Sequence, residues 1–135
     1  LGLVGSEMCI RDRDYSYLSI RKAGDKFILQ QAVCKDAERQ NPEQVKELAS
    51  IPVEYLKMPG VADNEWKTVY LRVKVRRGAV CTFAYSLDGK KYTTVGEAFT
   101  ARQGKWIGAK VGVFCVTPNE GNRGWADIDW FRMTK

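Results

Sequence analysis

Two aspartates near the end of the chain have the spacing that carboxylate chemistry uses. Asp127 and Asp129 are two residues apart in "GWADIDWFRMTK" (124–135), and side chains at that spacing share one face of a strand. Two carboxylates can divide the acid and base roles of glycosidic hydrolysis, or can ligate calcium, which prefers oxygen ligands. The simplest interpretation is that both are polar positions at the start of a strand. Calcium binding is the alternative that we retain ahead of catalysis.

Aromatic side chains form the second set of candidates, because a flat ring can stack on a sugar. Most aromatic residues of a β-fold belong to its core. Trp125 lies in a loop before the last expected strand, where a side chain has less packing duty, so it is the candidate carbohydrate-binding residue. The polar residues that alternate along 70–76 are interpreted as a solvated face. The aromatic candidates are Trp66, Trp106, Trp125, Trp130, Tyr70 and Tyr85.

Histidine is absent and the cysteines are scattered, which excludes several kinds of chemistry. Without histidine there is no His general base and no His-ligated metal. The cysteines form no CxxC motif, so neither a zinc site nor a thioredoxin-like motif is expected. Three of them (Cys34, Cys81 and Cys115) lie in apolar stretches, and we expect buried unpaired thiols there. Spacing alone leaves a disulfide between strands open.

Composition predicts one globular domain. The chain has 135 residues, 44% of them hydrophobic and 28% charged, with a formal net charge of +6. No apolar run approaches the about 18–20 residues of a membrane span. The basic clusters are no longer than "VRR" and "GKK", so we expect neither nucleic acid nor a membrane as a partner.

Alternating hydrophobicity predicts antiparallel strands along the chain. Residues 15–34 form two alternating runs around Gly24, and residues 79–96 form another pair around Asp88-Gly89, a strong hairpin dipeptide. Residues 67–78 alternate strictly, with Val69, Leu71, Val73 and Val75 inward. Residues 105–116 and 124–135 are predicted as two more strands. Short strands without a long helix predict an antiparallel β-sandwich.

Residues 35–60 are ambiguous. Asn41 could cap a helix with Pro42 at its first position, but Val45, Glu47, Ala49 and Ile51 alternate as in a strand. We expect a loop here, with one helical turn at most, followed by a short strand.

Residues 14–135 resemble a known family. "YSLDGKKYTTVGEAFTARQGKWIGAKVGVFC" followed by "GWADIDWFRMTK" resembles the C-terminal concanavalin A-like β-sandwich of glycoside hydrolase family 43, the β-xylosidases and α-L-arabinofuranosidases. "DYSYLSIRK" and "TVYLRVKV" are similar to earlier strands of that family. The resemblance implies a concanavalin A-like jelly roll, and it also implies calcium near a final-strand Asp of the "DxDWxR" kind.

The same resemblance implies that this chain is not itself the enzyme. The catalytic Asp, Asp and Glu of the family lie on a separate five-bladed propeller, and no residue here matches those motifs. We therefore expect a non-catalytic accessory domain that packs on the propeller of a hydrolase acting on xylan or arabinoxylan. Plant cell-wall polysaccharide is a further expected partner, and the parent is expected to be periplasmic or extracellular. The alternative is an independent carbohydrate-binding module.

Residues 1–13 are expected to be a non-native leader. "GLVGSEMCIRDR" stands where the family has an apolar strand similar to "GLVVMG", and it resembles an adapter read-through peptide of metagenomic reading frames. On this interpretation residues 14–135 form a partial domain that is incomplete at its N-terminus. The alternative is that "LGLVG" is an authentic strand.

Overall fold

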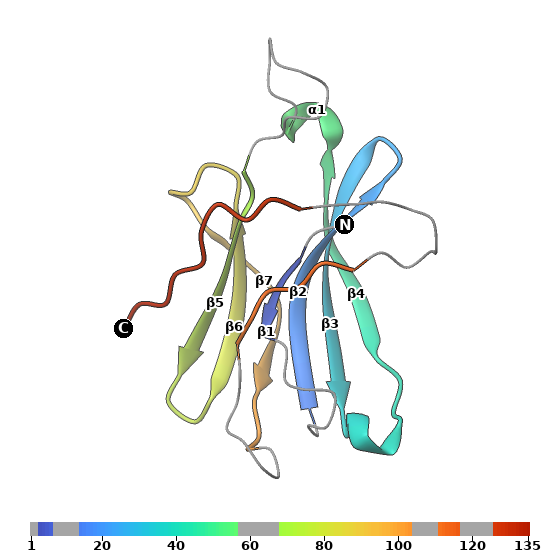
Figure 1. The fold of residues 1–135 in the computed structure, drawn as a ribbon, viewed down its shortest axis with the longest axis vertical. Coiled ribbons are helices and arrows are strands. Elements are labelled where there is room, and N and C mark those ends of the chain that lie inside the picture. The colour runs from blue at the N-terminus through green and yellow to red at the C-terminus, as the bar shows by residue number, and fades with distance from the viewer. Residues whose placement is uncertain (1–2, 7–13, 57–67, 104–110, 117–125) are drawn as a thin grey trace.

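Two antiparallel sheets lie face to face in the chain (Figure 1). The computed structural model describes residues 3–6, 14–56, 68–103, 111–116 and 126–135. The first sheet has the order β1-β2-β3-β4 and the second the order β5-β6-β7. The all-β sandwich expected from the sequence is confirmed. The strands are β1 (Leu3–Ser6), β2 (Asp14–Ala23), β3 (Lys26–Lys35), β4 (Gln44–Pro52), β5 (Tyr70–Arg76), β6 (Val80–Ser86) and β7 (Thr93–Thr100).

Helical structure is limited to two short turns in the described residues. A 3-10 turn, η1 (Ala37–Arg39), follows β3, and the helix α1 (Val53–Leu56) follows β4. Within the described ranges, neither is long and apolar enough to cross a lipid bilayer.

The β2–β3 hairpin forms where alternation predicts it. Its turn consists of Gly24 and Asp25, and Gly24 has φ +61°, a backbone angle that glycine adopts without a steric penalty. Leu29 on one face of β3 and Ala32 on the other are both fully buried. The sequence of β3 is apolar at both odd and even positions because the strand is buried on both faces.

The strand β4 corrects the loop that we expected in this region. Gln44–Pro52 pairs with β3 over its whole length, with one bulge beside Leu29 and Gln30. The alternation from Val45 to Ile51 therefore corresponds to a strand. The strand forms here because the edge of β3 has backbone groups that need hydrogen-bond partners. No helical turn begins at Asn41; the helical turns of this region are η1, before Asn41, and α1, after Pro52.

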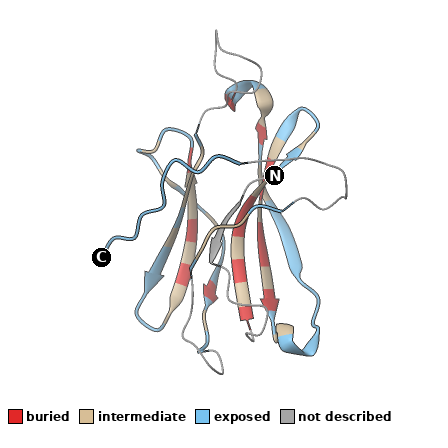
Figure 2. Cartoon of the chain, in the orientation of Figure 1, coloured by how far each residue is buried: buried red, intermediate tan, exposed pale blue. Residues whose placement is uncertain are grey.

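The core lies between the two sheets. Leu18 and Leu29 come from the first sheet and meet Cys81, Phe83 and Phe99 of the second. Buried positions recur along the facing strands in Figure 2. Leu71 and Val73 pack against this core as expected, but Val75 is exposed because it lies beside the β5–β6 turn, at the rim.

A buried amide joins the sheets at one point. Gln31 of β3 donates from Nε2 to the carbonyl oxygen of Glu97 (2.8 Å) and accepts at Oε1 from the amide of the same residue (2.8 Å). Its Nε2 also lies 3.3 Å from Ser16 Oγ. A buried amide satisfied on both of its ends fixes the position of β7 against β3.

The last two predicted strands are wrong in the residues that the structure describes. Residues 111–116 contain only an isolated bridge at Gly112, and residues 126–135 form no strand and are exposed throughout. Figure 1 shows the C-terminal segment crossing the second sheet rather than extending it. Alternation gives a strand two faces, but a ladder also needs a neighbouring edge to pair with.

Residues 3–6 pair antiparallel with β2, with Leu3 opposite Ser19 and Ser6 opposite Ser16. This is the arrangement expected if "LGLVG" is an authentic strand. The leader assigned to residues 1–13 stays a prediction.

Two of the three described thiols behave as expected. Cys34 and Cys81 are free and buried, and burial raises the pKa of the Cys81 thiol. Cys115 is free but exposed, because its segment lies outside the sheets. Buried thiols of this kind act as small apolar side chains.

Candidate functional site

The C-terminal segment, residues 126–135, lies against the start of β5. Thr68 Oγ1 donates a hydrogen bond to Asp129 Oδ2 (3.2 Å). The ring of Trp130 has its centroid 6.1 Å from that of Tyr70, at an angle of 47°. The Arg132 guanidinium carbon lies 5.0 Å from the Trp130 ring centroid, within cation–π distance. Side-chain contacts, rather than a backbone ladder, therefore hold this segment to the outer face of the second sheet.

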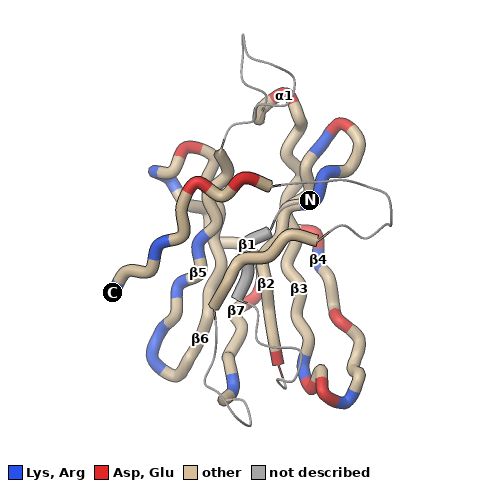
Figure 3. Tube along the Cα trace, in the orientation of Figure 1, with Lys and Arg blue, Asp and Glu red and all other residues tan. Residues whose placement is uncertain are grey.

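A row of cations continues along β5 from this point. The outward positions alternate with Leu71 and Val73, which face the core. The pairing of β5 with β6 has no bulge, so the alternation holds to the end of the strand. Figure 3 shows Lys and Arg recurring along β5 and at its turn to β6. We call the resulting surface the basic aromatic face; its members are Tyr70, Arg72, Lys74, Arg76, Trp130 and Arg132.

Two contacts give this face a defined shape. The guanidinium carbon of Arg72 lies 3.4 Å from the centroid of the Tyr92 ring, a close cation–π contact. Tyr70 lies over Gly89, where a Cβ atom would be only 2.8 Å from the tyrosine Cζ. Contacts of this kind reduce the number of positions that long side chains sample. An arginine held in place loses less conformational entropy when it binds a ligand.

One of the proposed calcium ligands, Asp129, lies at one end of this face. Asp127 and Asp129 are both exposed, and Asp129 already accepts the hydrogen bond from Thr68. No group of three His, Cys, Asp or Glu side chains suited to a metal occurs within the described ranges. Calcium takes about six to eight oxygen ligands, so these two carboxylates fall short of a site by themselves. Their role as calcium ligands stays a prediction.

Trp125, the predicted sugar-stacking residue, lies outside the described residues. Trp130 is 53% exposed and lies in the adjoining segment. A core position was expected for Trp130 because most aromatic residues of a β-fold belong to its core. The arginine two residues later was the available signal, since a neighbouring cation indicates a ring near solvent.

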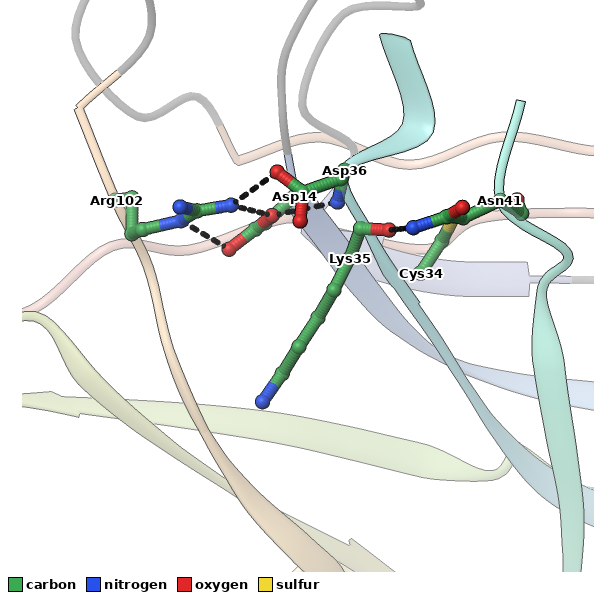
Figure 4. Close-up of polar contacts among 6 residues, drawn as sticks. All are labelled: Asp14, Cys34, Lys35, Asp36, Asn41 and Arg102. Atoms are coloured by element: carbon green, nitrogen blue, oxygen red, sulfur yellow. Dashed lines mark hydrogen bonds and ion pairs between the residues drawn. The ribbon is translucent and has the colours of Figure 1, made fainter. Parts of the chain in front are cut away.

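A second cluster, of charged residues, lies where β2 begins and β3 ends (Figure 4). Arg102 donates from Nε to Asp14 Oδ2 (2.5 Å), from Nη2 to Asp14 Oδ1, and from Nη2 to Asp36 Oδ1 (3.0 Å). The Asp36 amide also donates to Asp14 Oδ1 (2.9 Å). The Asp14 side chain is only 4% exposed, whereas Arg102 is half exposed.

The electrostatics of this cluster favour the ionised form of the Asp14 side chain. The hydrogen bond from Arg102 lowers the pKa of Asp14, against the opposing effect of desolvation. The cluster borders an open depression of about 470 Å³ that Phe99 and Glu97 also line. Because both Asp14 oxygens are already bonded within the chain, the carboxylate is suited to structure rather than to proton transfer.

A third polar group joins β2 to the residues before β4. Tyr15 and Tyr17 donate from their hydroxyls to the two oxygens of Glu43, at 2.8 and 2.6 Å. Burial and the neighbouring carboxylate raise the pKa of both phenols. Phe114 lies edge-on to Tyr17, with ring centroids 5.1 Å apart. Both carboxylate oxygens of Glu43 thus accept hydrogen bonds from side chains of its own chain. The contact between Phe114 and Tyr17 holds residues 111–116 over the outer face of the first sheet.

Comparison with known proteins identifies a family for the chain as a whole. The family model described as "Beta xylosidase C-terminal Concanavalin A-like domain" matches residues 5–134. A protein named Beta-xylosidase from Formosa agariphila is 36% identical over 63 residues, which are 47% of this chain and 10% of that protein. The chain thus aligns with about a tenth of the length of this relative. No solved structure matches significantly.

Proposed function

Because the chain belongs to the family of β-xylosidase C-terminal concanavalin A-like domains, we propose that it is the accessory domain of a family 43 glycoside hydrolase. The substrate we propose for the parent enzyme is xylan or arabinoxylan. The observation that carries the proposal is the family match over residues 5–134. The likeness to a protein named Beta-xylosidase supports a hydrolase as the parent.

Exposed apolar side chains support a partner domain. Val111 and Val116 of one segment and Phe131 and Met133 of the C-terminal segment are all exposed, Met133 to 77%. Exposed apolar groups favour a covering partner, because burial removes them from water. We propose that the catalytic propeller of the same parent chain covers at least one of these two segments.

Three of the described carboxylates, Asp14, Asp88 and Glu43, support a non-catalytic role. A glycosidase acid needs a raised pKa, so that it holds its proton at neutral pH. Here the pKa of Asp14 is lowered by Arg102, and that of Asp88 is lowered to about 2 by the backbone amides of Lys90 and Lys91. Both oxygens of Glu43 accept tyrosine hydroxyls. These groups are acceptors held by their own chain.

Two measurements test the proposal. The purified chain should not hydrolyse an aryl β-xyloside or an aryl α-L-arabinofuranoside, whereas the parent reading frame should hydrolyse at least one of them. The DNA upstream of the Asp14 codon should encode the propeller. Turnover by the chain itself, or an upstream frame without a propeller, would contradict the proposal. The second of these results would favour an independent carbohydrate-binding module.

A further inference from the structure

The basic aromatic face has cations without carboxylate partners among the described residues. Arg102, Arg21 and Lys46 all form ion pairs elsewhere in the sandwich. By contrast, no described carboxylate lies within ion-pair distance of the outward cations of β5, which are Arg72, Lys74 and Arg76. All three are exposed. Unpaired cations two residues apart on a strand create a positive potential along it.

Charge and rings are arranged in order along this face. Trp130 and Tyr70 lie at the Thr68 end, where Asp129 is also found. The cations occupy the remainder of β5 down to its turn with β6 (Figure 3). An anionic ligand would therefore place its charges over Arg72, Lys74 and Arg76, and a neutral ring would lie against Trp130.

We propose that the basic aromatic face binds a polysaccharide that carries uronic acid carboxylates. The planar fork of an arginine matches a carboxylate with two parallel hydrogen bonds, and Arg72 is already held over the Tyr92 ring. The exposed indole of Trp130 offers an apolar surface on which a sugar ring can stack. The choice of polysaccharide over nucleic acid, which is also anionic, rests on the proposed function.

Binding experiments on the full chain test this inference. The probes are polygalacturonate, the same polymer after methyl esterification, neutral arabinoxylan and single-stranded DNA, each in affinity electrophoresis and calorimetry. We expect the chain to bind polygalacturonate most tightly and to lose most of that affinity after esterification. Added salt should weaken binding, because exposed charges are screened beyond about 10 Å at 0.1 M salt.

Three substitutions locate the site. Arg72→Gln and Arg76→Gln should each weaken binding about tenfold, the size expected when one charge-assisted contact is lost. Trp130→Ala should weaken binding of polygalacturonate and of any neutral glycan that binds. Lys26→Gln is the matched control, because it removes one exposed cation from the first sheet. Circular dichroism confirms that each variant is folded.

The outcomes separate this inference from the proposed function. Equal binding of the esterified polymer, equal loss in Lys26→Gln, or tighter binding of DNA would each overturn it. No binding to any probe would also overturn it, and would leave the cations as protection of an edge strand against pairing with other chains. None of these results affects hydrolysis by the parent enzyme, which tests the proposed function.

Discussion

Asp14 shows what one buried charge requires in this sandwich. Its side chain is almost wholly buried, and it accepts hydrogen bonds from Arg102 and from the amide of Asp36. Burying a carboxylate is unfavourable unless such partners replace its water. The cluster joins β2, in the first sheet, to Arg102, which follows β7 of the second sheet. The Asp14 carboxylate therefore links the two sheets.

Replacing Asp14 with alanine should therefore destabilise the chain. We predict a loss of about 1.5–3 kcal/mol in the free energy of unfolding, the value typical of hydrogen bonds to a charged group. Glu47→Ala is the control, because it removes the exposed Arg21–Glu47 pair and should cost about 0–1 kcal/mol. Urea denaturation measures both variants, and equal losses would contradict the role of Asp14.

The same variant should change how stability depends on pH. Because the pKa of Asp14 is lowered in the folded chain, folding favours its ionised form. That contribution is complete above the unfolded pKa of about 3.9 and is lost as the pH falls through the lower folded value. The unmodified chain should thus lose more stability than Asp14→Ala on acidification below about pH 4. Parallel curves for the two proteins would contradict this assignment.

At the scale of elements, the position of β7 depends on one close approach. Gly96 of β7 has φ +72°, and a Cβ atom there would lie 2.2 Å from Gln31 Oε1. Gln31 is the buried amide that bonds to both backbone groups of Glu97. The register between β6 and β7 also shifts here. A side chain at residue 96 would therefore displace the contact that aligns the two sheets.

Alanine substitutions at two glycines separate backbone strain from this contact. Gly78 in the β5–β6 turn has φ +82°, and a Cβ atom there would have nothing within 4 Å, so Gly78→Ala carries the strain alone. We predict a cost of about 1 kcal/mol for Gly78→Ala and of about 2–4 kcal/mol for Gly96→Ala. Thermal unfolding followed by circular dichroism measures the difference. Equal shifts in melting temperature would show that the Gln31 side chain moves aside without a loss of stability.

At the scale of the whole molecule, the chain has a closed core and an open outer surface. The facing strands bury their side chains, whereas residues 126–135 are exposed throughout and residues 111–116 are exposed in part (Figure 2). The exposed side chains include Val116, Phe131 and Met133. In our proposals, the catalytic propeller covers exposed apolar side chains and polysaccharide binds the basic aromatic face.

An uncovered apolar surface should make the isolated chain self-associate. We predict that light scattering will show oligomers whose mass rises with protein concentration. The combined variant Phe131→Ser and Met133→Ser should shift the chain towards monomer. Tyr55→Ser should not, because this exposed ring belongs to α1, outside both segments. A monomer at all concentrations, or equal effects of both variants, would count against a docking surface here.

The sequence by itself determined the parts of this protein that depend on neighbouring residues. Alternation and a turn glycine are local signals, and they predicted the β2–β3 hairpin, the inward Leu71 and Val73 of β5 and the all-β fold. The family motifs are local in the same sense.

Tertiary structure decided what depends on a distant partner. Residues 44–52 form a strand because β3 offers an edge, and residues 126–135 alternate without forming one. Arg102 finds Asp14 across 88 residues, a pairing that no spacing rule predicts. The exposure of Trp130 was likewise set by where the last segment lies. A backbone ladder and a buried charge each need a partner in space, and only the folded chain supplies it.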